Sequence, residues 1–453
     1  MTVQTPDRSA PDARTDADVV IIGAGVIGSA LAYELSRRGH RTLNVDSLPA
    51  AGYGSTSYSS AIVRFSYSTL QGVAMAWEAL HYWRNWSTYL GRHEPGDTAD
   101  PSELIELVTC GMALLDTGGG LASRVQPHFD AHGVPYSYWD TAELHRRVPL
   151  LDLGRMGPPA PVDSDDFWSD PTEDLPGAVW MPDAGYVNDP QLAARNLQHA
   201  AERLGAQFRF HSTVSAVNRR DGRVRGVTLS GGTVLSAPVV VNVAGPDSAR
   251  VNDLAGLSST MTIRTRPMRQ EVHHLPSPRG TDGSPITHML VDEDTGVYMK
   301  PEAGGMLAIG SLEPACDELE WLDSPDGYRP TVTAQGWDRQ TLRLARRIPG
   351  LQIPHQPRGI VGIYDVADDW IPIYDRSDLD GFYVAIGTSG NQFKNAPFAG
   401  HLMAELIEAV EAGHDHDGDP LQVTGRYTGA CIDLSCFSRN REINQDSSFS
   451  VCG

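Results

Sequence analysis

The chain has few cysteines, and their arrangement shows no sign of a disulfide framework. Only five occur among 453 residues, they are scattered, and no two have Cys-x-x-Cys spacing. An odd number of dispersed cysteines is typical of a reducing compartment, so we expect a cytoplasmic protein. The missing paired-cysteine motif, together with the lack of a second Gly-x-Gly-x-x-Gly, also excludes a pyridine-nucleotide disulfide reductase.

Long apolar runs and an excess of positive charge are missing as well. The nearest candidate for a membrane span, residues 19–35, is interrupted by three glycines, whereas a span needs about 18 or more apolar residues. The 36 Lys and Arg residues against 57 Asp and Glu residues give a net charge of −21, the wrong sign for a nucleic-acid partner. Residues 1–17 are polar and lack the apolar core of a secretion signal, which predicts a disordered tail.

A βαβ unit begins directly after this tail. "DVVIIG" is predicted to be a buried strand, "AGVIGSALAYELSRRG" a helix and "HRTLNVD" a second strand. Gly23, Gly25 and Gly28 have Gly-x-Gly-x-x-Gly spacing, which provides a tight turn, a close approach of a pyrophosphate to the helix N-terminus, and close helix–strand packing. Asp46 ends the second strand, where a carboxylate accepts the hydroxyls of a ribose. The unit predicts a dinucleotide site, without distinguishing NAD from FAD.

The rest of the chain alternates between sheet and helix patterns. An amphipathic helix over 189–207 has Asp189 as its N-cap. Alternating strands follow, with a turn at Asp221-Gly222, and antiparallel strands are expected over 256–354. A final strand, loop and helix are predicted at 382–410, and the Pro- and Asp-rich stretch 152–180 is predicted to be an irregular insertion.

Four stretches carry a resemblance to a known family. They are "GSTSYSSAIVR" (54–64), "PDAGYVNDPQLA" (182–193), "VVVNVAGPDS" (239–248) and "DGFYVAIGTSGNQFKNAP" (380–397). In this order they resemble the FAD-dependent amine oxidoreductases of the D-amino-acid oxidase and sarcosine oxidase family, over nearly the whole chain. The resemblance implies an α/β fold: a Rossmann-like FAD-binding domain, formed by a βαβ unit with an inserted β-meander, and a substrate domain with an antiparallel or mixed sheet.

The resemblance also implies that both domains are discontinuous. The expected FAD-binding domain comprises 18–75, 186–255 and 355–430, and the expected substrate domain comprises 76–185 and 256–354. Residues 431–453 are then a C-terminal extension. The FAD is expected to be extended, with its adenosine near Gly23, Asp46 and Val214. Further cofactor contacts are expected from two groups of residues, the first being Ser55, Thr56, Ser57 and Gly245, and the second being Gly387, Gly390, Asn391, Gln392 and Phe393 of the late loop.

Three residues are expected in the substrate site. By resemblance to sarcosine oxidases, Arg64 and Lys394 together hold the carboxylate of the substrate, and Tyr364 contacts the substrate. Each has an alternative: a structural ion pair for Arg64, a solvated side chain or a partner to a local Asp for Lys394, and a core position for Tyr364. The neighbouring carboxylates Asp365, Asp368 and Asp369 are expected in a solvated turn, the alternative being that they hold a second cationic group of a larger substrate. His414 and His416 are assigned to turn chemistry, so no metal site is expected.

Several positions depart from the family pattern. Gly362 stands where monomeric sarcosine oxidases have the cysteine that links the flavin, so noncovalent FAD is expected. Ala308 replaces the lysine that activates oxygen in those oxidases, and Leu312 replaces a substrate-site histidine. Near residue 364 the chain has no arginine of the kind that the amino-acid-oxidase branch uses to bind a carboxylate.

These observations predict a sarcosine oxidase-like oxidase or dehydrogenase. It would oxidise the C–N bond of a secondary, N-methyl or cyclic amino acid by hydride transfer to flavin, giving an imine that can hydrolyse. Oxygen or another acceptor then takes the electrons. The alternatives are a flavin monooxygenase, which typically has a Gly-Asp motif where this chain reads "AIGTSG", and a flavoprotein without catalytic activity.

Overall fold

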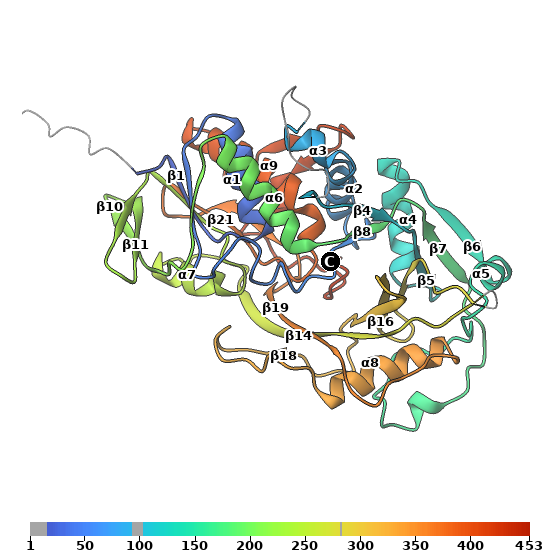
Figure 1. Cartoon of the computed structure of the whole chain (residues 1–453). Coiled ribbons are helices and arrows are strands. Elements are labelled where there is room, and N and C mark those ends of the chain that lie inside the picture. The colour runs from blue at the N-terminus through green and yellow to red at the C-terminus, as the bar shows by residue number, and fades with distance from the viewer. Residues whose placement is uncertain (1–15, 93–102, 281–282) are drawn as a thin grey trace, which may run out of the picture.

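The computed structural model describes residues 16–92, 103–280 and 283–453. Most of the predicted disordered tail, residues 1–15, lies outside the described residues. The chain forms two parts, a sheet flanked by helices and, below it in Figure 1, a broad second sheet. The expected α/β fold with two discontinuous parts is confirmed. In the described part of the chain, helices that combine the length and apolar character of a membrane span do not occur.

The first part is built on a six-stranded sheet with the order β20-β21-β13-β1-β2-β9. All neighbours are parallel except β20 and β21. Strand β1 is central and is buried along its length, as expected when helices cover a parallel sheet. The strands are β1 (Val19–Ile22), β2 (Thr42–Val45), β9 (Gln207–Arg209), β13 (Val239–Asn242), β20 (Ile373–Arg376) and β21 (Phe382–Ile386).

Helix α1 (Val26–Arg37) packs between α6 (Pro190–Arg203) and α9 (Ala396–Glu411). A Cβ on Gly400 would come within 2.7 Å of the backbone of Ala30, so glycine permits this close helix pair. The predicted N-cap of α6 is confirmed, because the Asp189 side chain accepts from the backbone N–H of Leu192. The remaining helices of this part are α2 (Leu70–Arg84), α3 (Trp86–Tyr89) and α7 (Ser248–Leu254).

The predicted meander forms the three-stranded sheet β10 (Val214–Arg220), β11 (Arg223–Leu229) and β12 (Val234–Ser236). Asp221 and Gly222, the predicted turn, both have positive φ values, 53° and 77°. That geometry matches the right-handed twist of a two-residue hairpin, which explains why Asp-Gly occupies it. Two smaller sheets pair β3 (Ile62–Val63) and β4 (Leu107–Thr109) with β8 (Gly185–Val187), and β22 (Gln422–Thr424) with β23 (Cys431–Asp433).

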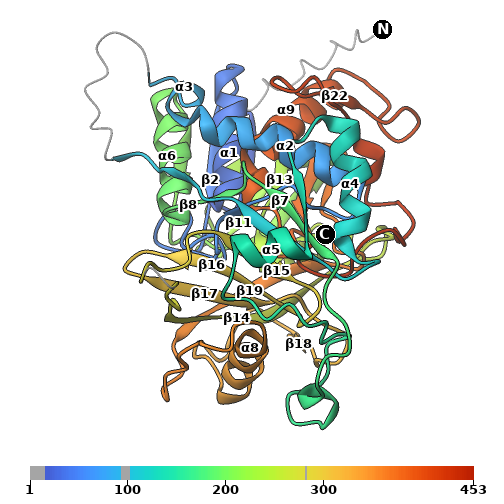
Figure 2. The ribbon, with the colours of Figure 1, turned by 90° about the vertical axis from the view of Figure 1, so that its right-hand side faces the viewer.

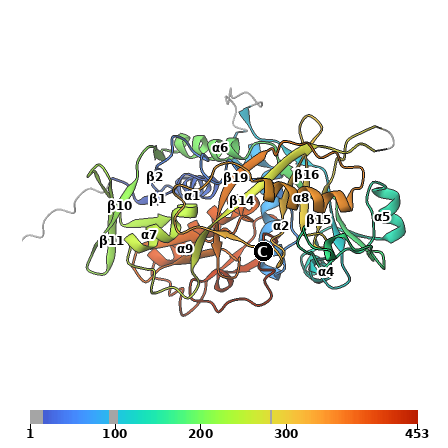
Figure 3. The same cartoon turned by 90° about the horizontal axis from the view of Figure 1, so that it is seen from below.

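The second part is a nine-stranded mixed sheet with the order β18-β14-β17-β16-β15-β5-β7-β6, and β19 also pairs with β14. Helix α8 (Ala334–Arg347) covers its outer face, as Figures 2 and 3 show. At the end of α8, Arg347 is fully buried and its guanidinium lies 2.8 Å from both Asp292 and Asp294. The strands are β5 (Met112–Asp116), β6 (Ser137–Asp140), β7 (Gly177–Met181), β14 (Thr265–Pro276), β15 (Met289–Asp292), β16 (Val297–Glu302), β17 (Met306–Ser311), β18 (Glu320–Trp321) and β19 (Gly359–Ala367), and the helices α4 (Leu121–His132) and α5 (Thr141–Arg147) lie near the β5–β6 end.

Three segments differ in placement from the expected domain ranges. Strand β19, within the range expected for the FAD-binding domain, pairs along its whole length with β14 of the nine-stranded sheet. Helix α2, which mostly falls in the range expected for the substrate domain, packs against α9. Strand β23, in the expected extension, pairs with β22. The sheet that a strand joins depends on contacts distant in sequence, which a local pattern does not reveal.

Candidate active site

A cavity of about 490 Å³ runs between the two parts. It is lined by the β1–α1 turn, the segment 53–64, the strands β14, β16 and β19, and the loop before α9. The expected site residues Ser57 and Gly387 do not line it. All the others do: Gly23, Gly25, Gly28, Asp46, Ser55, Thr56, Arg64, Val214, Gly245, Tyr364, Gly390, Asn391, Gln392, Phe393 and Lys394.

The glycine motif has the geometry of a nucleotide cradle. Gly23 has φ 121°, and a Cβ there would lie 2.3 Å from the carbonyl oxygen of Val243. A Cβ on Gly28 would lie 2.4 Å from the carbonyl oxygen of Gly23. Gly25, in contrast, would meet only the Thr56 hydroxyl, at 3.3 Å, and otherwise faces the cavity. The first turn of α1 has no acidic side chain, so an anionic pyrophosphate fits here at the positive end of the helix.

Asp46 and Thr56 hold this turn in place. The Asp46 carboxylate accepts from the backbone N–H groups of Ala24, at 2.7 Å, and Leu48, at 2.8 Å. Burial raises the pKa of Asp46 above its usual range. The Thr56 hydroxyl accepts from the N–H of Val26 at 3.1 Å, which satisfies one exposed donor of the helix N-terminus. The contact between Asp46 and a ribose stays a prediction.

Ser55 and Ser57, on either side of Thr56, have different roles in the segment 53–64. Ser55 donates to the carbonyl oxygen of Ile363 at 2.7 Å and so ties this segment to β19. Ser57 donates to carbonyl oxygens of its own turn, those of Tyr53 and Gly54. Its hydroxyl is used within the turn, which explains why Ser57 does not line the cavity.

The loop before α9 is anchored by a buried carboxylate. Asp365 accepts from the N–H of Gly387 through its side chain, at 2.7 Å, and from the N–H of Ser389 through its carbonyl, also at 2.7 Å. Gly387 has φ 66°, and a Cβ there would lie 3.0 Å from the Cβ of Ala367. Gly387 therefore serves the turn of the backbone rather than the cavity wall.

The expectation of a solvated turn is wrong for two of the three aspartates. Asp365 is 2% exposed and Asp369 is 0% exposed, whereas Asp368 is exposed. Asp369 forms an ion pair with Arg441 at 2.7 Å. Burial raises the pKa of Asp365 to about 7. The partners of Asp369 come from a segment some seventy residues away, so the local sequence carried no signal of its burial.

The two expected carboxylate-binding residues lie together around Tyr67. Arg64 and Lys394 are 6% and 4% exposed. The Arg64 guanidinium lies 4.9 Å and the Lys394 ammonium 5.1 Å from the centroid of the Tyr67 ring. Lys394 donates to the Tyr67 hydroxyl at 3.1 Å and to the carbonyl oxygen of Asn391 at 2.7 Å. Tyr67 was missed in the sequence, where nothing distinguishes it from other aromatic residues.

Neither cation has a carboxylate partner among the described residues. Arg64 donates to the carbonyl oxygens of Ser66 and Val451, the latter at 2.7 Å. Burial and the nearby charge of Arg64 hold the pKa of Lys394 well below its usual range. Neither the structural ion pair for Arg64 nor the solvated side chain for Lys394 is observed. A buried cation without an anion is costly, so this pair is suited to an anionic ligand.

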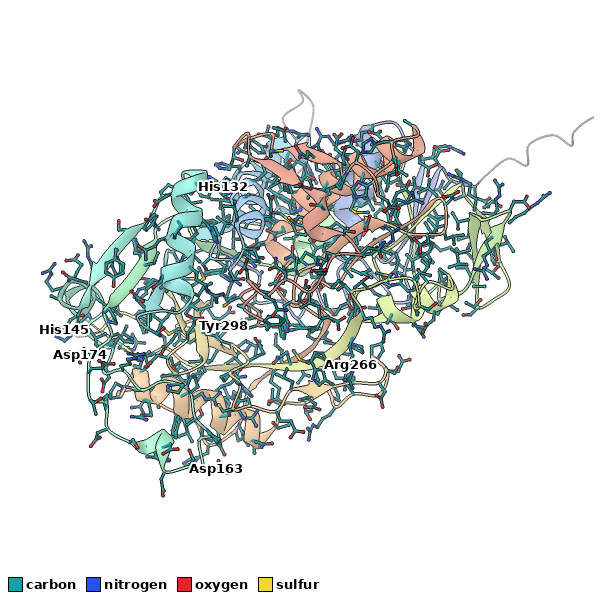
Figure 4. All side chains as sticks on the ribbon, turned by 180° about the vertical axis from the view of Figure 1, so that it is seen from behind. His132, His145, Asp163, Asp174, Arg266 and Tyr298 are labelled. Carbon is teal, nitrogen blue, oxygen red and sulfur yellow. The ribbon has the colours of Figure 1, made fainter. Side chains whose placement is uncertain are left out.

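Tyr364 lies in the cavity wall, packed against the loop before α9. Its ring stands 2.3 Å from the place where a Cβ on Gly390 would be, so a side chain at 390 would displace it. Burial, then Tyr298 and Glu313, raises the pKa of Tyr364 well above its usual range. Tyr298 also lines the cavity, where the two parts of the molecule meet (Figure 4). Tyr364 remains a candidate for substrate contact.

The positions that depart from the family pattern are also located. Gly362 and Leu312 line the cavity, and a Cβ on Gly362 would lie 3.1 Å from Tyr58. Ala308 is buried within β17 and does not line the cavity. Cys452, which the sequence did not indicate as a site residue, does line it. The charged groups near it, Arg64, Glu293 and Glu313, are distant along the chain, so only the fold brings Cys452 to this cavity.

Comparison with known proteins agrees with this geometry. The family model described as FAD dependent oxidoreductase matches residues 18–406. The chain is 26% identical to the glycine oxidase of Geobacillus kaustophilus over 404 residues, covering 88% of this chain and 94% of the relative. It is 23% identical to the sarcosine oxidase subunit beta of an Arthrobacter species, with 89% of each chain covered. The crystal structure of L-proline dehydrogenase from P. horikoshii matches with a TM-score of 0.69 and 21% identity, covering 88% of this chain and 99% of that one.

The family match spans most of the chain, and the cradle around Gly25 has the form that an FAD pyrophosphate requires. The homologues support oxidation of amino acids or amines with a flavin cofactor. The chain therefore belongs to the family of FAD-dependent oxidoreductases that includes glycine oxidase and the sarcosine oxidase beta subunit.

Proposed function

We propose that the protein oxidises the C–N bond of an amino acid whose carboxylate is held by Arg64 and Lys394, and that secondary, N-methyl or cyclic amino acids are preferred. The main support for this proposal is that these two buried cations lack carboxylate partners among the described residues and line the same cavity as the nucleotide cradle. Relatives named for glycine, sarcosine and L-proline support an amino-acid substrate.

Each group in the cavity has a proposed task. The N-terminus of α1 at Gly25 would hold the pyrophosphate of FAD, and the loop Gly390–Phe393 would contribute to holding its ring system. FAD, when bound, accepts a hydride from the carbon next to the nitrogen. Arg64 and Lys394 fix the carboxylate and thereby orient that carbon, and Tyr364 limits its movement on the other side. The amine must be neutral before the hydride leaves, and water then hydrolyses the imine.

Two rival functions are less well supported. A flavin monooxygenase has no need for two buried cations facing a substrate carboxylate, and "AIGTSG" stands ahead of the late helix, where that class typically has a Gly-Asp motif. A flavoprotein without catalytic activity would bind FAD but would show no reduction of the flavin by any amine. We also propose that the protein works in the cytoplasm, as its five unpaired cysteines indicate.

Anaerobic titration of the FAD-loaded protein tests the proposal. Glycine, N-methylglycine, both enantiomers of proline, and matched amines without a carboxylate are added while the visible absorbance of the flavin is followed. We expect amino acids to bleach the flavin and the matched amines to fail. Bleaching by the amines alone would refute the carboxylate clamp, and bleaching by none would refute amine oxidation. Re-oxidation by air or only by a dye then distinguishes an oxidase from a dehydrogenase.

A further inference from the structure

The segment Ser447–Gly453, here called the tail segment, folds back between the two parts of the molecule (Figure 1). It is held at Ser68, whose N–H donates to the carbonyl oxygen of Gly453 at 3.1 Å and whose hydroxyl accepts from the N–H of Ser448 at 3.1 Å. Val451 and Cys452 reach the cavity, and Cys452 is 3% exposed. The tail segment therefore lies in the space that the proposed function assigns to a substrate.

Val451 makes two main-chain contacts in that space. Its carbonyl oxygen accepts from the Arg64 guanidinium at 2.7 Å. Its N–H donates to the carboxylate of Glu313 at 3.0 Å. The nitrogen and the carbonyl carbon are attached to one Cα, so a single residue spans from a cation to a carboxylate. An α-amino acid has the same sequence of atoms, an amino nitrogen, one carbon and a carboxyl group.

Glu313 is an unusual residue for this position. It has φ 51°, a backbone conformation that non-glycine residues rarely adopt and that clusters at functional sites. The other hydrogen bond of its carboxylate comes from the Gln270 amide at 3.0 Å. Gln270, Leu312 and Val451 line the cavity, whereas Glu313 itself does not while Val451 is in place. Among the described residues, no Lys, Arg or His side chain forms an ion pair with Glu313. A ligand with a positive amino group would supply the missing partner.

We propose that Arg64 and Glu313 form the two poles of an α-amino-acid subsite, Arg64 for the carboxylate and Glu313 for the amino group, and that Val451 occupies both poles until a substrate displaces the tail segment. This rests on the proposed function and deepens it, because it assigns the amino group a place. Lys394 completes the carboxylate pole.

Glu313 also has a chemical task in this subsite. The ammonium of an amino acid must lose a proton before a hydride can leave the neighbouring carbon. The Glu313 carboxylate accepts that proton: an N–H bond breaks, its electron pair remains on nitrogen, and an O–H bond forms. Burial, with Asp317 as a further cause, raises the pKa of Glu313 to about 8. The ionised form that accepts the proton is therefore the main form only above about pH 8, and it is a stronger base than an ordinary carboxylate. The groups around it are Tyr298, Tyr364, Gln270, Cys452 and the Val451 N–H.

The amino-group pole is tested with Glu313→Gln, which keeps the size of the side chain and its acceptor for the Val451 N–H. The FAD-loaded variant and the wild type are titrated with N-methylglycine, L-proline and propanoate, and binding is read from the perturbed flavin spectrum. We expect at least about tenfold weaker binding of both amino acids, equivalent to the loss of one charge-assisted contact, and unchanged binding of propanoate, which has no amino group. Glu318→Gln, an exposed acid five residues on, is the matched control. The assignment would be overturned if the variant bound propanoate as much more weakly as it binds the amino acids, or if its binding of the amino acids were unchanged.

Competition by the tail segment is tested by deleting residues 447–453 and, separately, by Ser68→Ala, which loosens the segment without touching either pole. If the segment occupies the subsite about nine-tenths of the time, its loss should tighten amino-acid binding about tenfold. The Ser68→Ala variant should also bind amino acids more tightly. It keeps the test valid should the deletion variant fail to fold. Unchanged or weaker binding in both variants would overturn the competition.

The two levels of the proposal fail differently. If amino acids bind and depend on Glu313 but never bleach the flavin, the subsite stands and amine oxidation fails. If amino acids bleach the flavin and Glu313→Gln behaves like the wild type, amine oxidation stands and the Glu313 assignment is overturned.

Discussion

Replacing Lys394 with methionine tests whether this residue binds the substrate carboxylate without contributing to the binding of FAD. The Lys394 ammonium donates to the Asn391 carbonyl at 2.7 Å and to the Tyr67 hydroxyl at 3.1 Å, and the residue is 4% exposed. Methionine is similar in length and uncharged, so it fills the same space. Because burial and Arg64 hold the pKa of Lys394 well below its usual range, an arriving carboxylate favours the protonated form.

The size of the effect follows from one lost contact. A hydrogen bond to a charged group contributes about 1.5–3 kcal/mol, and about 1.4 kcal/mol corresponds to a factor of ten. We therefore expect amino-acid binding to weaken about 10- to 150-fold. The free energy of unfolding should change less than the free energy of binding. Removing a poorly solvated cation stabilises the fold, whereas leaving the Asn391 carbonyl without this donor destabilises it. FAD should stay bound, because Lys394 is not part of the cradle around Gly25.

The assay is anaerobic flavin reduction at increasing concentrations of N-methylglycine, which gives an apparent Kd and a limiting rate. Lys300→Met is the matched control, because Lys300 is the only other lysine in the sequence, is 5% exposed and does not line the cavity. In the wild type, the apparent Kd should rise as pH rises through the lowered pKa of Lys394, since the neutral amine holds a carboxylate less strongly. An apparent Kd in Lys394→Met that matches the wild type would refute the clamp.

Three further outcomes follow from the structure. Gly25→Val should abolish FAD binding while the apoprotein stays folded, because Gly25 faces the cavity; retention of the yellow cofactor through gel filtration would contradict this. Burial raises the pKa of Asp365 to about 7, well above the usual value for an aspartate, so its protonation stabilises the fold fully below about pH 4, and this contribution, about a few kcal/mol, is lost as pH rises through 7. Thermal unfolding of Asp365→Asn should accordingly depend less on pH between 5 and 8 than that of the wild type, and parallel curves would contradict this. Arg347→Met leaves two buried aspartates unpaired and should cost about 3–5 kcal/mol in the free energy of unfolding without changing the affinity for FAD.

Local patterns were sufficient to predict the nucleotide half of the molecule. The glycine spacing at 23–28 fixes a turn between a strand and a helix, and the burial of β1 confirms the assignment. The Asp221-Gly222 turn, the Asp189 cap, and the strand and helix on either side of the loop 387–395 were also predicted within a few residues. All of these depend on residues close together in the chain.

The substrate half depends on contacts that no local pattern contains. Glu313 meets Val451 across 138 positions, and Arg64 meets the same residue across 387. Asp365 is buried by the pairing of β19 with β14 and by the loop before α9, whose N–H groups it accepts from, and both are distant in sequence. Tyr67 becomes a site residue because two cations from distant segments approach its ring.

The most direct measurement of the central claim is a crystal structure of the FAD-loaded protein with a bound small carboxylic acid. The account predicts that the carboxylate contacts both Arg64 and Lys394 on one face of the flavin, with the acid's α-carbon turned toward the ring. A carboxylate bound elsewhere, or either cation directed away from the flavin, would contradict it.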